Sequence, residues 1–145
     1  MHTSTPDFQP ARVLDGYVSL SFLHALFGDD CIRAENNVYL YASRYLDGYD
    51  GGVWAYAALP EGGGFMKPEG EERWHFVNPQ NFADLTLGSE AAGIVITALV
   101  LNHRSWMYDH HDEEELCRLY CQRHRQLMAY AESHPEAAAI FRALD

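Results

Sequence analysis

The amino-acid sequence predicts an α+β fold in a single domain, with an antiparallel sheet, a meander of three to four strands, packed by several α-helices. Short aromatic and apolar runs in the middle of the chain are separated by glycine- and proline-rich turns, a pattern typical of consecutive antiparallel strands. Longer segments on both sides repeat apolar residues at helical spacing. The chain has 145 residues, the size of one ordinary domain, and no linker or repeat divides it.

The N-terminal part of the chain predicts two helices behind a loose entry segment. Residues 1–18 contain two prolines and no sustained period, so we expect a loosely ordered segment with one short strand around residues 12–14. A short helix capped by Ser21 follows and ends at Gly28. Across residues 30–46, apolar residues return every three or four positions, which predicts a longer helix.

A glycine-rich turn at residues 47–52 ends that helix and leads into the predicted sheet. Tight turns with unusual backbone angles require glycine, so we interpret Gly51 and Gly52 mainly as architecture, together with their neighbours Tyr49 and Trp54. Strands are predicted where apolar residues alternate or cluster between turns, at residues 53–59, 65–66, 73–77 and 82–85.

The C-terminal half of the chain is predicted to be helical. Residues 89–107 are apolar nearly all round, which is typical of a buried central helix. Gly93 inside this helix is expected to allow the close approach of a neighbouring segment. A second helix is expected from Asp112 onward, with leucine and tyrosine residues at helical spacing on its core face.

A final helix is predicted from Pro135 to the end of the chain. Ser133 has a side chain that can cap a helix start, and proline is favoured in a first turn. Glu136 is placed to reach back toward the cap. These residues together indicate a helix start at this point.

Composition narrows the classes of protein to which the chain can belong. With 21 acidic and 10 basic residues the net charge is −11, which argues against direct binding of nucleic acid through phosphate contacts. No uncharged apolar run reaches the roughly 18 residues of a membrane span, and no signal peptide is visible. Three cysteines fit a reduced setting, so we expect a cytoplasmic protein. The oligomeric state stays open.

One cluster of residues could carry metal or thiol chemistry. Cys117, Cys121 and His124 share a helix face, and thiolate and imidazole are ligands that suit zinc. Arg118 and Arg125 could lower the pKa of the Cys121 thiol. Structural zinc sites usually use paired knuckles, and no second pair exists, so packing inside the helix is favoured. We therefore predict no catalytic, cofactor-binding or metal residues, and keep a small Cys/His metal or thiol enzyme as the weaker alternative.

The densest charge feature is an acidic run at the predicted start of a helix, formed by Asp112, Glu113, Glu114 and Glu115. Acids in a first turn complement the helix dipole, and Glu114 can pair with Arg118 one turn later. The functional interpretation is an acidic patch presented to a basic partner. Asp145 is the second candidate, because a negative charge is disfavoured at the end of a helix.

Several short motifs occur in a fixed order along residues 19–145. They are Ser21-Phe22-Leu23, Leu26-Phe27-Gly28, Glu35-x2-Val38-Tyr39, Tyr49-x-Gly51-Gly52-x-Trp54-x-Tyr56, Gly63-Gly64-Phe65-Met66-x-Pro68, Asn81-Phe82, Ala91-Ala92-Gly93-Ile94, Asn102-His103, His134-Pro135-Glu136-Ala137 and Ile140-Phe141-Arg142-Ala143-Leu144-Asp145. Each motif alone is weak, but the set in this order resembles the KlcA/ArdB family of antirestriction proteins. An antirestriction domain is therefore expected over residues 19–145.

This resemblance implies an α+β fold and a role in protecting incoming mobile DNA from host type I restriction-modification systems, without catalysis. The implied partner is a protein, either the host type I restriction enzyme or an associated factor. An acidic DNA mimic that occupies a DNA-binding groove is the alternative. The candidate partner-binding residues are the acidic run and Asp145. The motif residues that we expect to be mainly structural are Tyr49, Gly51, Gly52, Trp54, Gly64, Phe65, Pro68, Gly93, His103 and Pro135.

Overall fold

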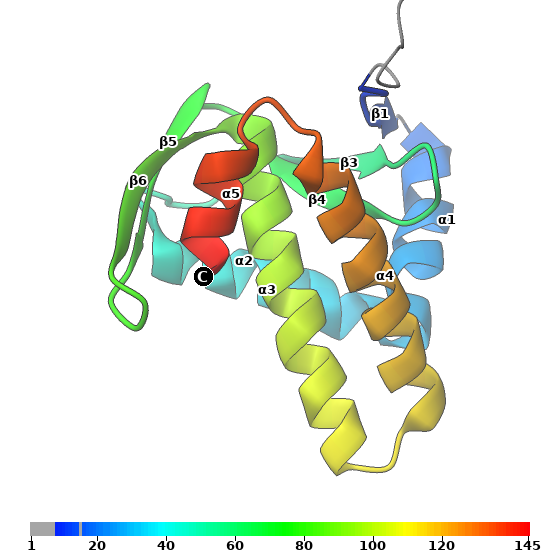
Figure 1. The fold of residues 1–145 in the computed structure, drawn as a ribbon. Helices are drawn as coiled ribbons and strands as arrows, with labels where there is room; N and C mark the ends of the chain where they lie inside the picture. The colour runs from blue at the N-terminus through cyan, green and yellow to red at the C-terminus, as the bar shows by residue number, and fades with distance from the viewer. Residues whose placement is uncertain (1–7, 15) are drawn as a thin grey trace, which may run out of the picture.

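The computed structural model describes residues 8–14 and 16–145 and has an α+β fold (Figure 1). The predicted class, antiparallel strands packed by several helices in one domain, is confirmed. In chain order the elements are β1 (Arg12–Leu14), α1 (Gly16–Phe27), the short 3-10 helix η1 (Gly28–Asp30), α2 (Cys31–Tyr45), β2 (Leu46–Asp47), β3 (Trp54–Ala58), β4 (Gly64–Pro68), β5 (Arg73–Asn78), β6 (Ala83–Gly88), α3 (Ser89–His110), α4 (Glu114–Glu132) and α5 (Ala137–Leu144).

The strands form two three-stranded antiparallel sheets rather than one meander. The first sheet has the order β1-β3-β4 and the second β2-β5-β6, so β4 and β5 follow each other in the chain without pairing. After β4 the chain turns away, and the Glu69 amide donates to the Val53 carbonyl at 2.9 Å. The second sheet also contains β2, a strand of two residues that directly follows α2. Its Leu46 lies opposite Phe76 of β5. A strand this short leaves no alternating pattern in the sequence.

Helix α3 is the centre of the fold and contacts α2, α4, α5 and strands of both sheets (Figure 1). All residues from 91 to 98 are buried, which confirms the predicted central helix. A Cβ added to Gly93 would lie 2.3 Å from the Met66 carbonyl oxygen, so the predicted close approach is also confirmed. The buried Thr97 hydroxyl accepts a hydrogen bond from the Met66 amide at 3.1 Å. Within the described residues, no helix combines the length and hydropathy that crossing a membrane requires.

The predicted start of the last helix is wrong in its details. α5 begins at Ala137, and Pro135 lies in the turn before it. Ser133 is the C-cap residue of α4, and the Glu136 amide at the start of α5 donates to His134 Nδ1 at 2.9 Å and not to Ser133. The Glu136 carboxylate instead accepts a hydrogen bond from the Gly88 amide at 2.9 Å, which joins the start of α5 to the end of β6. A contact between distant segments has displaced the local capping pattern.

Part of the predicted N-terminal segment is attached to the domain. β1 pairs antiparallel with β3, with Val13 opposite Ala57. The Ala11 amide donates to the Tyr130 hydroxyl at 3.0 Å, and the Phe8 ring lies 5.1 Å from the Tyr130 ring. Residues 1–7 of this segment lie outside the described residues.

Candidate functional site

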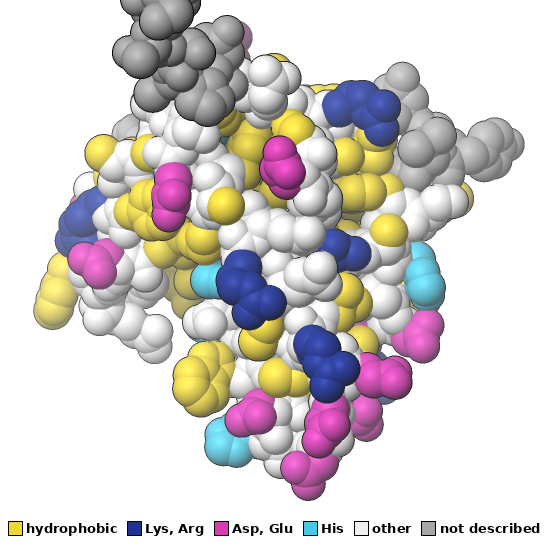
Figure 2. All heavy atoms as spheres, turned by 45° about the vertical axis from the view of Figure 1, so that its right-hand side comes forward, with side chains coloured by type: hydrophobic (Ala, Val, Ile, Leu, Met, Phe, Trp, Pro, Cys, Tyr) yellow, Lys and Arg dark blue, Asp and Glu magenta, His cyan; other side chains and the backbone are white. Residues whose placement is uncertain are grey.

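The acidic run lies at the turn between α3 and α4. These two helices form a hairpin whose far end extends beyond the rest of the molecule (Figure 1). Acidic side chains gather on that end in the space-filling view (Figure 2). We call Asp112, Glu113, Glu114 and Glu115 the acidic turn; all four are exposed. The feature that the sequence placed at a helix start is therefore also the tip of a projecting hairpin.

Backbone hydrogen bonds build the acidic turn tightly. The Glu113 amide donates to the Tyr108 carbonyl at 2.9 Å, and the Cys117 amide donates to the Glu113 carbonyl at 3.0 Å. Asp112 has a φ of 57°, the left-handed conformation that asparagine and aspartate adopt more readily than most residues. The anticipated pair between Glu114 and Arg118 is not among the ion pairs of the described residues. The carboxylates of the turn are thus available to solvent and to partners.

Trp106 adds an aromatic side chain close to the acidic turn. It lies on α3 one helical turn before His110, and it is 62% exposed. Tryptophan buries a large area on association and is enriched among the residues that dominate protein interfaces. The sequence pattern predicts a buried helix over residues 89–107, so the exposure of Trp106 was not expected. The cause is that the last turns of α3 extend past the elements that cover the rest of the helix.

A buried polar network joins the half of the hairpin nearer its tip to η1 and α2. We call Asp30, Asn37, Arg104, Tyr108 and Tyr120 the hairpin anchor. The Arg104 guanidinium donates from Nε to Asp30 Oδ2 at 2.6 Å and from Nη2 to Asp30 Oδ1 at 3.0 Å. It also donates to Asn37 Oδ1 at 2.7 Å and to the Tyr108 hydroxyl at 3.0 Å. The Tyr120 hydroxyl donates to Asp30 Oδ2 at 2.7 Å. Residues from η1, α2, α3 and α4 therefore meet in one network.

The hairpin anchor stays ionised although it is buried. Burial opposes the charge on Asp30, but hydrogen bonds from Arg104, Tyr108 and Tyr120 outweigh it and hold the pKa of Asp30 below its usual value. Burial also opposes the charge on Arg104, but the bonds with Asp30 and Tyr108 keep its pKa above the usual value. In the sequence, Asp29 and Asp30 stand before α2, where acids commonly complement a helix dipole. Nothing local to the sequence connects Asp30 with Arg104, 74 positions later.

Asp145 lies away from the acidic turn. The C-terminus is at the end of α5 beside the middle of α3, well separated from the far end of the hairpin (Figure 1). Asp145 is exposed, and its amide donates to the Phe141 carbonyl at 3.0 Å. The nearby Arg142 guanidinium donates to the Phe82 carbonyl at 3.1 Å rather than to a carboxylate. The structure therefore separates the two predicted partner-binding features.

The aromatic residues of the motif after α2 contact each other and Trp74 of the second sheet. The Trp54 indole donates from Nε1 to the Tyr49 hydroxyl at 2.9 Å. The Tyr49 ring lies 6.0 Å from each of the Trp54 and Trp74 rings. Gly51 and Gly52 have φ values of 108° and 121°, which residues with a Cβ rarely adopt. These residues shape the passage from β2 to β3.

Four other motif residues lie in two separate places, three of them in β4 and His103 on α3. Gly64 lies where a Cβ would be 2.2 Å from the Ala57 carbonyl oxygen, and its neighbours Phe65 and Pro68 are buried in β4. The His103 Nδ1 lies 2.8 Å from the Tyr41 hydroxyl on α2. Burial, together with the charge of Arg44, lowers the pKa of His103 and favours the neutral ring.

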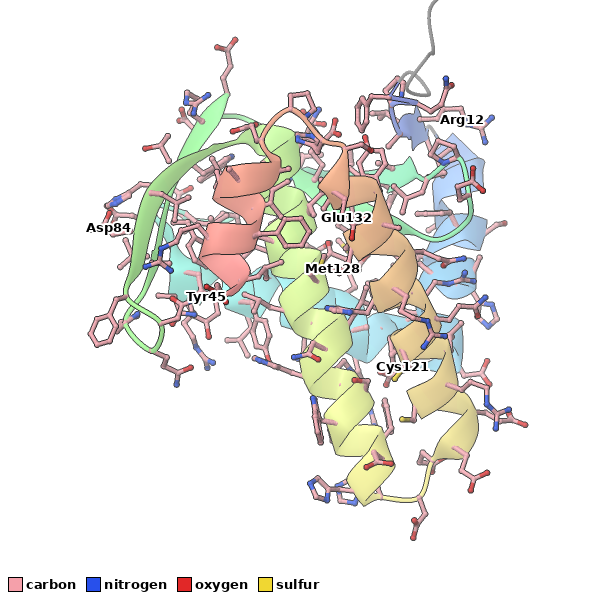
Figure 3. The ribbon with its side chains drawn as sticks, viewed as in Figure 1. Arg12, Tyr45, Asp84, Cys121, Met128 and Glu132 are labelled. Carbon is pink, nitrogen blue, oxygen red and sulfur yellow. The ribbon has the colours of Figure 1, made fainter. Side chains whose placement is uncertain are left out.

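The cysteine and histidine residues of α4 have the environment of packed side chains. Cys117 and Cys121 are half-buried, and Cys121 lies on the side of α4 that faces α3 (Figure 3). Burial, with a contribution from Cys121, raises the pKa of the Cys117 thiol, the opposite of what a reactive thiolate needs. Burial lowers the pKa of His124. Over residues 8–14 and 16–145, no three His, Cys, Asp or Glu side chains are grouped to hold a metal ion.

Comparison with known proteins identifies relatives over most of the chain. The sequence pattern of the antirestriction protein family matches residues 47–145. The Escherichia coli K12 protein YubI is 45% identical over 126 residues, which cover 87% of this chain and 89% of YubI. The Escherichia coli antirestriction protein KlcA is 34% identical over 127 residues, 87% of each chain.

A solved structure shares the whole fold. It comes from work on the KlcA and ArdB proteins, which are described as having a novel fold and antirestriction activity against type I DNA restriction systems in vivo but not in vitro. The two chains superimpose with a TM-score of 0.81, with 34% sequence identity and coverage of 100% of both. The resemblance drawn from the motifs is confirmed, and this chain belongs to the antirestriction protein family.

Proposed function

We propose that this chain protects incoming mobile DNA from host type I restriction-modification systems by binding a protein, without catalysis. The observation that carries the proposal is the match over the full length of the chain to a structure from the work on KlcA and ArdB, whose activity is described against type I systems. The family pattern over residues 47–145 supports the same conclusion.

Binding to a protein is favoured over binding to DNA on two grounds. The net charge of −11 opposes contact with phosphates, since each such contact needs a positive side chain. The related proteins act in vivo but not in vitro, and this difference implies a component that cells supply. We therefore favour a host factor associated with the restriction enzyme as the partner, with the enzyme itself as the second choice.

The acidic turn is the surface that we assign to this partner. Four exposed carboxylates at the tip of a projecting hairpin increase the rate of encounter with a basic surface and select against acidic ones. Trp106, 62% exposed and close by, supplies apolar area that charge alone does not provide. The hairpin anchor fixes the direction in which this surface points.

A plating assay tests the function and the surface together. Unmodified phage is plated on a type I restricting host that expresses the native chain, and we expect a rise in plating efficiency. A variant with Glu113, Glu114 and Glu115 replaced by glutamine is expected to reduce this protection by at least about tenfold. A matched control changes the charge by the same amount elsewhere on the surface, at Glu61, Glu72 and Glu132.

Each result of the assay has a clear meaning. No rise in plating efficiency with the native chain contradicts the function. Equal loss of protection in the acidic-turn variant and the control contradicts the surface, because net charge alone then explains the effect. Asp145→Asn is tested beside them, since Asp145 lies apart from the acidic turn and can act independently of it.

The DNA mimic predicts a different result with purified components. A mimic competes with duplex DNA for the restriction enzyme, and the competition falls steeply as salt rises. Protein binding through a host factor predicts no inhibition of the purified enzyme until an extract of the restricting host is added.

A further inference from the structure

The turn between β5 and β6 carries the most exposed large hydrophobic side chain of the described residues. Phe82 is 85% exposed. In Figure 1 this turn projects at the left of the molecule, on the other side of α3 from α4 and away from the acidic turn. A single exposed hydrophobic residue is common on protein surfaces and needs no explanation by itself. The backbone of Phe82 distinguishes it from such residues.

Phe82 has a left-handed backbone conformation, with a φ of 61°. A Cβ makes this conformation unfavourable, and for a bulky side chain it is an outlier at a position that glycine or asparagine would occupy at lower cost. Among the described residues other than glycine, only Phe82 and Asp112 have a positive φ. Because the Phe82 ring is exposed, packing within the chain does not compensate for the strain. Strained residues of this kind cluster at functional sites.

Contacts on both sides of Phe82 hold the turn in this conformation. The Asn81 side chain accepts a hydrogen bond from the Ala83 amide at 3.0 Å and donates one to the Ala143 carbonyl of α5 at 2.8 Å. The Arg142 guanidinium, also on α5, donates to the Phe82 carbonyl at 3.1 Å. The backbone of Phe82 is therefore fixed from α5, and its side chain is presented from a rigid base.

The surface beside this turn combines apolar area with an unpaired negative charge. Arg142 lines a hollow of about 550 Å³ on α5, together with the half-buried Phe141 and Leu144 and the exposed Asp145. Asp145 forms no ion pair with a described residue, and Arg142 is directed at backbone carbonyls of the turn. A partner that fits this surface offers apolar contact for a ring and a positive charge for Asp145.

We infer that Phe82 is a docking residue, which inserts into an apolar pocket of the target protein while a basic side chain of that protein lies beside Asp145. The inference rests on the proposed function and adds a second contact to the acidic turn. A rigidly held aromatic side chain binds strongly, because it buries a large area and loses little conformational freedom. Nucleic acid and anionic membrane surfaces are disfavoured as partners, because Asp145 and the net charge of −11 repel them.

Substitution of Phe82 separates a binding role from a structural one, because only a structural role requires the ring for stability. Asparagine adopts the left-handed conformation more readily than phenylalanine. Phe82→Asn is therefore expected to leave the Tm unchanged or to raise it by up to about 4 °C. In the plating assay the same variant is expected to lose at least about tenfold in protection.

Three further variants make the plating result specific, with expression levels matched by immunoblot. Phe82→Tyr keeps an aromatic ring and is expected to protect within about threefold of the native chain. Asp145→Asn is expected to lose about threefold, as is usual for a charge at the rim of an interface. Leu20→Asn is the matched control, because Leu20 is 66% exposed on α1, and it is expected to protect like the native chain.

A lower Tm for Phe82→Asn would overturn the inference, since the ring then supports the fold. Full protection by Phe82→Asn, or an equal loss with Leu20→Asn, would overturn it as well. Full protection by Asp145→Asn would refute the basic side chain in the partner. If the native chain gives no protection, the proposed function fails and this inference fails with it. If the native chain protects and Phe82→Asn protects equally, only this inference fails.

Discussion

Replacing Asp30 by asparagine removes the negative charge around which the hairpin anchor is built. Arg104 is 8% exposed, and Asp30 is the carboxylate that pairs with it, through bonds of 2.6 and 3.0 Å. Removing one partner of a buried ion pair typically costs 3–5 kcal/mol, since the other charge stays buried. We expect about 3 kcal/mol for Asp30→Asn, the low end, because the new amide oxygen can still accept from Arg104 or Tyr120.

The measurement is urea unfolding followed by circular dichroism, with thermal unfolding beside it. For a chain of this size, about 3 kcal/mol corresponds to a fall in Tm of roughly 6–12 °C. The neighbouring Asp29→Asn is the matched control. Asp29 is exposed and forms a surface ion pair with His24 at 3.0 Å, so a change of less than about 1 kcal/mol is expected.

The native chain and Asp30→Asn are also expected to differ in how their stability depends on pH. The pKa of Asp30 is lowered in the folded state, so the stability that its charge contributes is present above the unfolded value of about 3.9 and is lost as the pH falls through the folded value. The gap in unfolding free energy between the native chain and Asp30→Asn should therefore narrow below about pH 4. A gap below 1 kcal/mol at pH 7, or one that does not narrow in acid, refutes this account of the hairpin anchor.

Two further predictions concern the core and the second sheet. Gly93→Ala places a Cβ 2.3 Å from the Met66 carbonyl oxygen, and we expect a loss of about 1–3 kcal/mol in urea unfolding although alanine is the better helix former; a stabilised variant contradicts the close approach. His75 hydrogen-bonds with Asp84 on the outer side of the second sheet, away from the helices (Figure 3), and this bond raises the pKa of His75. Stability from this contact is present below the unfolded value of about 6.5 and is lost as the pH rises through the folded value. An NMR titration of the ring checks the direction, and Asp84→Asn should move the midpoint down; a midpoint at or below the unfolded value counts against the bond.

Periodicity in the sequence was sufficient to predict the central helix and the fold class. Residues 91–98 are apolar apart from Thr97, so the helix has no polar face and has to be surrounded by other elements. The division of the strands between two sheets was not predictable in the same way. Which strands pair depends on where the turns send the chain, and β2 is too short to leave a pattern. Ser133, Pro135 and Glu136 show the same limit, because Glu136 binds Gly88 in preference to a local cap.

In the candidate site too, the features that depend on neighbouring residues could be predicted, and those that depend on distant contacts could not. The acidic turn could be predicted, because its four carboxylates are consecutive in the sequence. The exposure of Trp106 could not, because it depends on how far α3 extends past its neighbours. The hairpin anchor joins residues 74 and 90 positions apart, Asp30 with Arg104 and with Tyr120, and it leaves no signal in any local window.

The buried ion pair of the hairpin anchor is better explained by the orientation that it gives the two helices than by the stability that it adds to the fold. A buried ion pair pays a desolvation cost, and apolar residues of similar volume often hold two helices together equally well. Apolar contacts, however, leave the rotation of a helix about its axis loosely fixed, whereas hydrogen bonds have preferred angles. The Arg104 guanidinium fixes α3 against both η1 and α2, and Tyr120 fixes α4 against the same carboxylate. Both arms of the hairpin are thereby tied to one point, and the acidic turn at its tip is presented to a partner in a single direction.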